Sequence, residues 1–142
     1  VIADTGQFWS GLTGELLCNS SLVLIVMDQR RASTYGAIKA LELCQRLGIP
    51  MARIAFVLNR ASGMSHSEIE RIEDSLGCEE LFRLADGKTT IEALVGMGRI
   101  EELVEEGPAP IPDIELLLTK LLPRTGIEFP AIERKKTRRF FT

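Results

Sequence analysis

The clearest feature of the hydrophobic pattern is a pair of continuous apolar runs. Residues 22–27 and 54–58 contain only nonpolar side chains, several of them β-branched. Runs of this length are typical of strands buried on both faces, as in a parallel sheet. Shorter segments at residues 2–4 and 80–84 predict two further strands, and the first of these would end at Asp4.

Between the strands, apolar residues recur every three or four positions, which is the spacing of an amphipathic helix. Ser33 stands at the start of one such segment and Gly48 follows its end, as helix boundaries require. The predicted helices cover residues 6–19, 33–47, 65–76, 89–105 and 114–122. Alternation of strands with helices predicts the α/β class, here a three-layer sandwich with a mostly parallel sheet.

In sheets of this kind, ligands bind beyond the carboxyl ends of the strands. The residues expected there are 4–6, 28–30, 59–60 and 85–87. A carboxylate held at a strand end, as at Asp4, can bind Mg²⁺ directly or through water. A glycine just beyond it, Gly6, lets a backbone N–H approach a phosphate. The alternative is that Asp4 only caps the end of its strand.

A second candidate pair follows the strand at residues 54–58. The side chain of Asn59 offers a donor and an acceptor, which suits the edge of a purine base. The guanidinium plane of Arg60 is suited to stacking on a base. The alternative is that Asn59 only shapes a turn. The chain's single histidine, His66, lies in a polar loop and forms no catalytic set with other residues, so no catalytic residue is assigned.

Composition narrows the class of protein. The chain has 142 residues, of which 45% are hydrophobic and 26% charged, with a net charge of −3. This length can bury one core without disulfides or metals. The cysteines, Cys18, Cys44 and Cys78, follow no zinc or redox spacing and predict reduced thiols in a cytoplasmic protein. The cysteine pattern therefore argues against a disulfide scaffold and a zinc module. The longest apolar run is too short to span a bilayer, which argues against an integral membrane protein.

Charge is concentrated at one end of the chain. The last nine residues carry +5, and since the whole chain carries −3, the first 133 residues carry −8. We therefore separate a body, residues 1–122, from a basic irregular tail, residues 123–142. An anionic membrane surface or a nucleic acid is the expected partner of such a tail, and a solvated tail without a partner is the alternative. The basic residues are Arg134, Lys135, Lys136, Arg138 and Arg139.

The predicted strands and helices of residues 1–122 resemble, in their order and spacing, the C-terminal half of the MinD/ParA family of deviant P-loop ATPases. The resemblance rests on the strand that ends in Asp4-Thr5-Gly6 and on the later strand that ends in Asn59-Arg60. It implies part of a P-loop NTPase fold, with ATP and Mg²⁺ as cofactors. Asp4 would be the Walker B carboxylate that serves Mg²⁺, Gly6 would lie near the γ-phosphate, and Asn59 would contact adenine with Arg60 beside it.

The resemblance also implies a biological role. Members of the family form ATP-dependent homodimers that position plasmids, division proteins, pili or flagella. Some end in a basic segment that binds membrane, which would place this protein in the cytoplasm and at the membrane periphery. The alternative is a catalytically inactive interaction module of the same fold. An unrelated flavodoxin-like or Rossmann-type domain has less support, since the chain has no G-x-G-x-x-G motif.

The family's phosphate-binding loop would precede the strand at residues 2–4. Because Val1 falls inside that expected strand, we expect the chain to be a fragment, with ATPase activity only when the upstream half is present. Residues 86–90, Asp-Gly-Lys-Thr-Thr, resemble the end of a P-loop, and a circularly permuted loop is an alternative. However, Phe82 stands where the motif requires glycine, which favours an ordinary loop and helix start.

Overall fold

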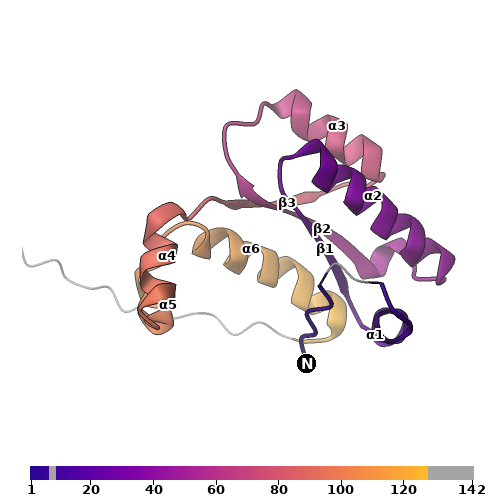
Figure 1. The fold of residues 1–142 in the computed structure, drawn as a ribbon, viewed down its shortest axis with the longest axis horizontal. Helices are drawn as coiled ribbons and strands as arrows, with labels where there is room; N and C mark the ends of the chain where they lie inside the picture. The colour runs from indigo at the N-terminus through magenta and orange to yellow at the C-terminus, as the bar shows by residue number, and fades with distance from the viewer. Residues whose placement is uncertain (7–8, 128–142) are drawn as a thin grey trace, which may run out of the picture. The chain divides into compact units, whose positions relative to one another are not determined.

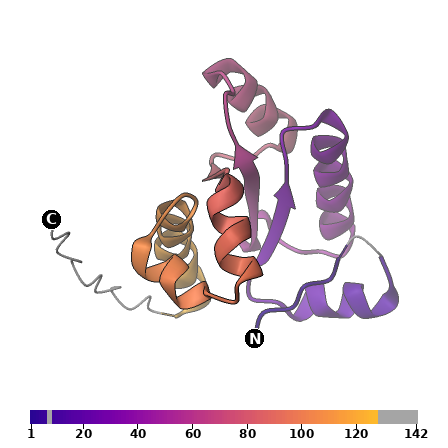
Figure 2. The ribbon, with the colours of Figure 1, turned by 60° about the vertical axis from the view of Figure 1, so that its left-hand side comes forward.

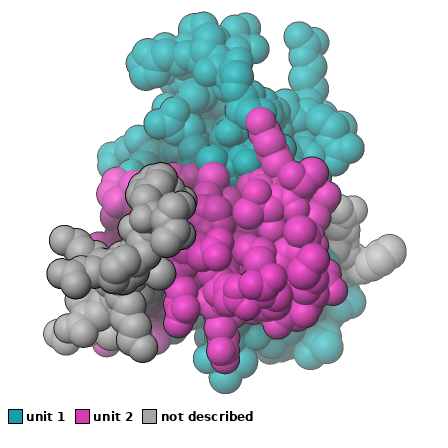
Figure 3. Space-filling view, turned by 90° about the vertical axis from the view of Figure 1, so that its left-hand side faces the viewer, with its two compact units in different colours: residues 1–86 teal, residues 87–142 magenta. Residues whose placement is uncertain are grey.

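The computed structural model describes residues 1–6 and 9–127. The chain divides into two compact units, residues 1–86 and residues 87–142 (Figure 3). The boundary that the sequence analysis placed between residues 122 and 123 stays a prediction, because residues 128–142 lie outside the described part of the chain.

Unit 1 is built on a three-stranded parallel sheet in the order β1-β2-β3. The α/β class and the parallel sheet are therefore confirmed. The strands are β1 (Val23–Met27), β2 (Ile54–Ala61) and β3 (Leu81–Ala85). Val23 pairs with Ile54 and Phe56 pairs with Leu81. The helices are α1 (Gly11–Asn19), α2 (Arg31–Arg46) and α3 (His66–Leu76), with a 3₁₀ turn at Met51–Arg53.

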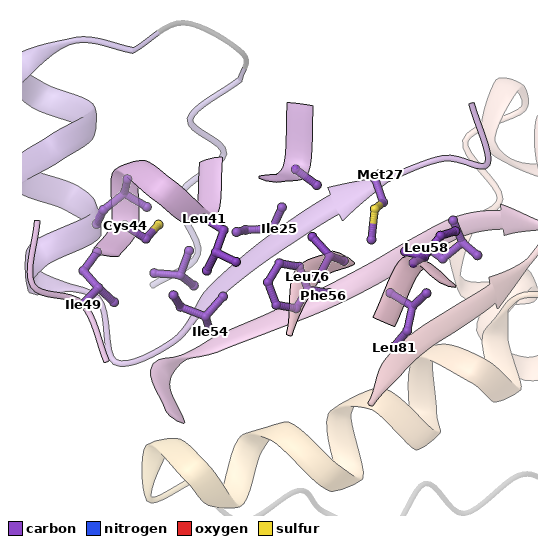
Figure 4. Packing of buried hydrophobic residues seen from close by; sticks show 14 of the residues in the cluster. Ile25, Met27, Leu41, Cys44, Ile49, Ile54, Phe56, Leu58, Leu76 and Leu81 are labelled. Carbon is purple, nitrogen blue, oxygen red and sulfur yellow. The ribbon is translucent and has the colours of Figure 1, made fainter. Parts of the chain in front are cut away.

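Helices α2 and α3 lie side by side on one face of the sheet, which the views from two directions show (Figures 1 and 2). The core of unit 1 fills the space between them and the strands (Figure 4). Its largest fully buried side chains are those of Phe56, Leu58, Leu76 and Cys44. Burial among these nonpolar groups raises the pKa of the Cys44 thiol, because the thiolate would lose its hydration there.

Strand β1 is exposed on its second face, although its apolar run predicts burial on both. Leu24 and Val26 are 45% and 60% exposed, whereas Val23, Ile25 and Met27 are buried. Among residues 1–6 and 9–127, the strand lies at the edge of the sheet and pairs only with β2. It carries no charged residue, whereas the other edge strand, β3, carries the exposed Arg83. An uncharged apolar edge such as β1 is a surface on which further strands can pair.

The predicted strand at residues 2–4 is wrong. These residues form no strand, and Val1 and Ile2 are fully exposed. A strand exists only when a neighbour pairs with its backbone, and β1 has no second neighbour among the described residues. Helix α1 also begins later than the predicted residue 6, at Gly11, where the Ser10 hydroxyl accepts a hydrogen bond from the Thr13 N–H.

Unit 2 is helical in its described part. It contains α4 (Lys88–Gly96), α5 (Ile100–Glu106), α6 (Ile111–Leu121) and a final 3₁₀ turn at Leu122–Thr125. Leu94, Leu103 and Ile111 form its small core. The single helix predicted over residues 89–105 is wrong, because the chain turns at Gly98, whose φ of 69° suits glycine. There the Arg99 N–H donates to the Leu94 carbonyl and closes α4.

Replacement of Gly87 by alanine is expected to destabilise unit 2 by about 1–3 kcal/mol. Gly87 is the residue before α4, and a β-carbon there would overlap the Ile91 side chain and lie 2.7 Å from the Ala109 carbonyl oxygen. Gly96→Ala in the same helix is the control, since its β-carbon would meet nothing within 4 Å. That variant is expected to gain about 0.5–1 kcal/mol from helix propensity. Equal shifts of both variants in urea unfolding would contradict the prediction.

Candidate functional site

The candidate site lies where β1 and β2 end. Both strands run in the same direction with Met27 beside Leu58, so the segments that follow them meet at one edge of the sheet. The first segment is the loop of Asp28, Gln29 and Arg30 before α2. The second is the end of β2 with the residues just after it, 59–62.

Gln29 joins the two segments. Its side-chain amide donates to the Arg60 carbonyl oxygen at 2.8 Å and to the Ser62 hydroxyl at 3.2 Å. A hydrogen bond between two loops restricts both, so the site has a defined shape before any ligand binds. The sequence analysis placed Gln29 at a strand end but assigned it no role, because nothing in the local sequence shows which distant carbonyl it reaches.

The loop after β1 is held by its own polar groups. The Asp28 carboxylate accepts hydrogen bonds from the Arg30 N–H at 3.0 Å and from the Arg30 Nε at 2.7 Å. The Asp28 N–H in turn donates to the Ser33 hydroxyl at 3.0 Å. The hydrogen bond from the Arg30 side chain, followed by that from its backbone, lowers the pKa of the Asp28 carboxyl. Asp28 is therefore ionised and engaged at neutral pH.

Strand β2 continues three residues beyond its predicted end, so that Asn59 and Arg60 lie inside it. The pairing with β3 shifts between Leu58 and Ala61, which marks a β-bulge. Arg60 has a φ of 56°, in the left-handed region that is uncommon for residues other than glycine. Strained backbone of this kind occurs often at functional sites. Because of the bulge, the side chains of Asn59 and Arg60 do not follow the regular alternation of a strand.

The four predicted site residues fall into two separate groups. Asn59 is half-buried and its side-chain oxygen accepts the Arg60 N–H at 3.0 Å, while Arg60 is exposed. Asp4 accepts the Gly6 N–H at 3.1 Å, and Gly6 has a φ of 61°. No hydrogen bond or ion pair links these two groups in the described residues. The structure thus connects Asn59 and Arg60 to Gln29, and leaves Asp4 and Gly6 in a turn of their own.

These residues do not by themselves fit Mg²⁺-ATP. Within residues 1–6 and 9–127, no three His, Cys, Asp or Glu side chains are grouped to hold a metal. The Gly6 N–H already donates to Asp4, so this N–H is not free to bind a phosphate. Asp4 supplies one carboxylate and Asn59 one amide, and each is held in a separate local hydrogen bond.

A groove extends from Gln29 along the outer side of unit 1, between α2 and α3. Its volume is about 460 Å³. Apolar side chains line it together with two arginines: Ile38, Met64, Ile72, Arg31 and Arg71. Glu68, also at the groove, accepts hydrogen bonds from the Ser65 N–H at 2.9 Å and from the Ser65 hydroxyl at 2.7 Å, and so caps α3.

The Glu68 cap predicts a specific pH dependence. The hydrogen bond from the Ser65 N–H, followed by that from its hydroxyl, lowers the pKa of the Glu68 carboxyl. A carboxyl whose pKa is lower in the folded state stabilises the fold above its unfolded pKa and loses that effect as the pH falls through its folded pKa. Glu68→Gln should therefore reduce the loss of stability between about pH 5 and pH 3 in urea unfolding.

The control for this prediction is Asp74→Asn, on the same helix. Its exposed carboxylate makes no side-chain hydrogen bond among the described residues. The Asp74→Asn variant should keep the acid dependence of the unmodified chain. An identical acid dependence of the Glu68→Gln variant and the unmodified chain would contradict the assigned role of the cap.

The fold and the site together define an α/β protein whose small parallel sheet gathers polar residues at its carboxyl edge. Comparison with family models, curated proteins and solved structures finds no match to this chain. Throughout the part of the chain that the structure describes, every helix is too short or too polar to cross a membrane. The basic tail residues, Arg134, Lys135, Lys136, Arg138 and Arg139, lie outside the described residues.

Proposed function

We propose that this chain is the C-terminal half of a MinD/ParA-like ATPase, a nucleotide-switched protein that positions plasmids, division proteins, pili or flagella. The observation that carries the proposal is the free edge of β1. A parallel sheet is normally covered on both faces and rarely ends on an uncharged apolar strand. The unpaired edge of β1 supports a missing neighbour, which in this family would be the strand that leads into the phosphate-binding loop. The exposure of Leu24 and Val26 supports a missing layer over that face of the sheet.

The upstream half would complete both the sheet and the site. The three-layer sandwich and the P-loop NTPase fold then belong to the whole protein, of which this chain forms one part. Asp4 would serve Mg²⁺, Gly6 would lie near the γ-phosphate, and Asn59 would contact adenine with Arg60 beside it. Bound Mg²⁺-ATP would supply the phosphoryl group and its charge. The chain alone has no phosphate loop among its described residues, so we expect no hydrolysis from it.

The complete protein would be a cytoplasmic homodimer when it holds ATP. Its tail, with Arg134 to Arg139, would contact an anionic membrane surface or a nucleic acid. Five cations near an anionic leaflet contribute about 1 kcal/mol each, which supports reversible rather than permanent attachment.

Calorimetry of Mg²⁺-ATP binding tests the proposal on two proteins, this chain and the longer product of the same reading frame. We expect binding only to the longer product, and a loss of affinity in its Asp4→Asn and Asn59→Ala variants. Asn19→Ala is a matched control, because the Asn19 amide only donates to the Glu15 carbonyl within α1. A longer product with an intact phosphate loop that binds no adenine nucleotide would overturn the proposal.

An inactive interaction module of the same fold is the second candidate, and the charge of +5 on the last nine residues favours it. This reading expects no effect of nucleotide on any form of the protein, and a partner interaction that depends on the tail. An interaction that persists after deletion of residues 129–142 would count against it.

A further inference from the structure

We infer that the groove between α2 and α3 is a docking site for an acidic peptide segment of a partner protein, one that carries carboxylates beside apolar side chains. The inference does not rest on the proposed ATPase function. It uses only residues of unit 1, and it can hold or fail whether or not the protein binds a nucleotide.

The floor of the groove is apolar. Ile38 of α2 and Met64, which precedes α3, are half-buried, and Ile72 of α3 is buried beside them. Methionine adapts its shape to different ligands and is common at surfaces that bind peptides. The groove is open along its length between two helices, which suits an extended or helical segment better than a small enclosed ligand.

Two arginine side chains line the groove beside these apolar residues. Arg31 comes from α2 and Arg71 from α3, and both side chains are exposed. Arg31 makes no hydrogen bond or ion pair among the described residues, and the Arg71 Nε donates only to the Ser67 carbonyl at 3.0 Å. Neither guanidinium forms a salt bridge with a carboxylate among the described residues. This is notable because the first 133 residues carry a net charge of −8. The Glu68 carboxylate at the groove accepts hydrogen bonds from Ser65 and also interacts electrostatically with Arg71. Because Arg31 and Arg71 outnumber this single carboxylate, the charged side chains that line the groove leave a net positive charge, which favours an acidic ligand.

The chemistry favours carboxylates over phosphate. A phosphate site at the start of a helix needs free backbone N–H groups. At α3 the Ser65 side chain caps the first turn, while Glu68 accepts the Ser65 N–H, so these donors are used. The chain's own basic segment, Arg134 to Arg139, has the wrong charge for the groove. The Thr34 hydroxyl at the groove can bond the backbone of a bound peptide.

Fluorescence anisotropy with labelled synthetic peptides tests this inference. The probe places Glu and Leu at helical spacing. One comparison peptide replaces each Glu with Lys, and another replaces each Leu with Ser. We expect saturable binding of the Glu/Leu peptide alone, and affinity about tenfold weaker in the Arg31→Ala/Arg71→Ala double variant, because two exposed charge pairs are lost.

Arg46→Ala is the matched control, since Arg46 is an exposed arginine on α2 outside the groove. This variant should bind the Glu/Leu peptide as the unmodified chain does. Circular dichroism should show that all variants are folded, as expected for exposed side chains. Unchanged affinity in the double variant, equal binding of the Lys/Leu peptide, displacement by inorganic phosphate, or no saturable binding of the Glu/Leu peptide would each overturn the inference.

Discussion

Phe56→Ala is expected to cost unit 1 about 3–5 kcal/mol of stability, the largest effect of any single substitution considered for this protein. The Phe56 ring is 1% exposed and belongs to the central strand, β2, in the core beneath α2 and α3. Its removal would leave a cavity that neighbours on two strands and two helices must fill. A loss of this size approaches the whole stability of many small domains, so much of the variant should be unfolded.

Urea unfolding followed by circular dichroism measures this loss. Leu12→Ala is the control, because Leu12 is also a large apolar residue of unit 1 but is 71% exposed. Its substitution should change stability by less than about 0.5 kcal/mol. A Phe56→Ala variant no less stable than the Leu12→Ala variant would show that the core of unit 1 is not packed around this ring.

We expect this chain to self-associate through the edge of β1, and Val26→Lys to keep it monomeric. Val26 is 60% exposed on β1, whose outer edge pairs with no strand among the described residues. An exposed, uncharged apolar edge promotes pairing between molecules, and a single lysine at such an edge prevents it. We expect the variant to remain monomeric at concentrations about tenfold higher than those at which the unmodified chain associates.

Sedimentation velocity over a concentration series measures the effect. Val95→Lys is the matched control, since Val95 is 50% exposed but lies on helix α4, where the backbone groups are already bonded. A general effect of added charge would make both variants monomeric, and association through surfaces other than β1 would leave both unchanged. Either result would contradict the role assigned to the edge.

The same substitution also bears on the proposed function. In the longer product, the upstream half would pair with the edge of β1 and cover the face that carries Leu24 and Val26, so Val26→Lys should weaken its docking and with it the binding of Mg²⁺-ATP. The lysine would place an unpaired charge in a buried sheet face, which is costly. Normal nucleotide binding by that variant would mean that the neighbour of β1 is not the phosphate-loop strand.

Several elements followed from the sequence by itself. The runs at residues 22–27 and 54–58 predicted β1 and most of β2, because a short apolar run that contains several β-branched residues favours a strand over a helix. The apolar spacing predicted α3, and the glycine at residue 77 predicted its end. In the structure this glycine has a φ of 60°, as a glycine that ends a helix commonly does. These signals are local: they depend on side-chain shape and on backbone preference over a few neighbouring residues.

The site was less accessible to such reasoning. Sequence analysis identified Asn59 and Arg60 as residues at the end of a strand, but neither the bulge nor the bond from Gln29 to Arg60 could be predicted. That bond joins residues thirty-one positions apart. Its partners are decided by the register of β1 against β2, which no local pattern encodes.

What the sequence by itself determined is therefore the class of the protein and the identity of most helices and strands, since these follow from local periodicity. Only the tertiary structure decided whether each strand has neighbours. Residues 2–4 form no strand, and Leu24 and Val26 remain exposed at an edge. The physical reason is that a strand is completed by hydrogen bonds from another segment, so its existence and burial depend on what lies beside it.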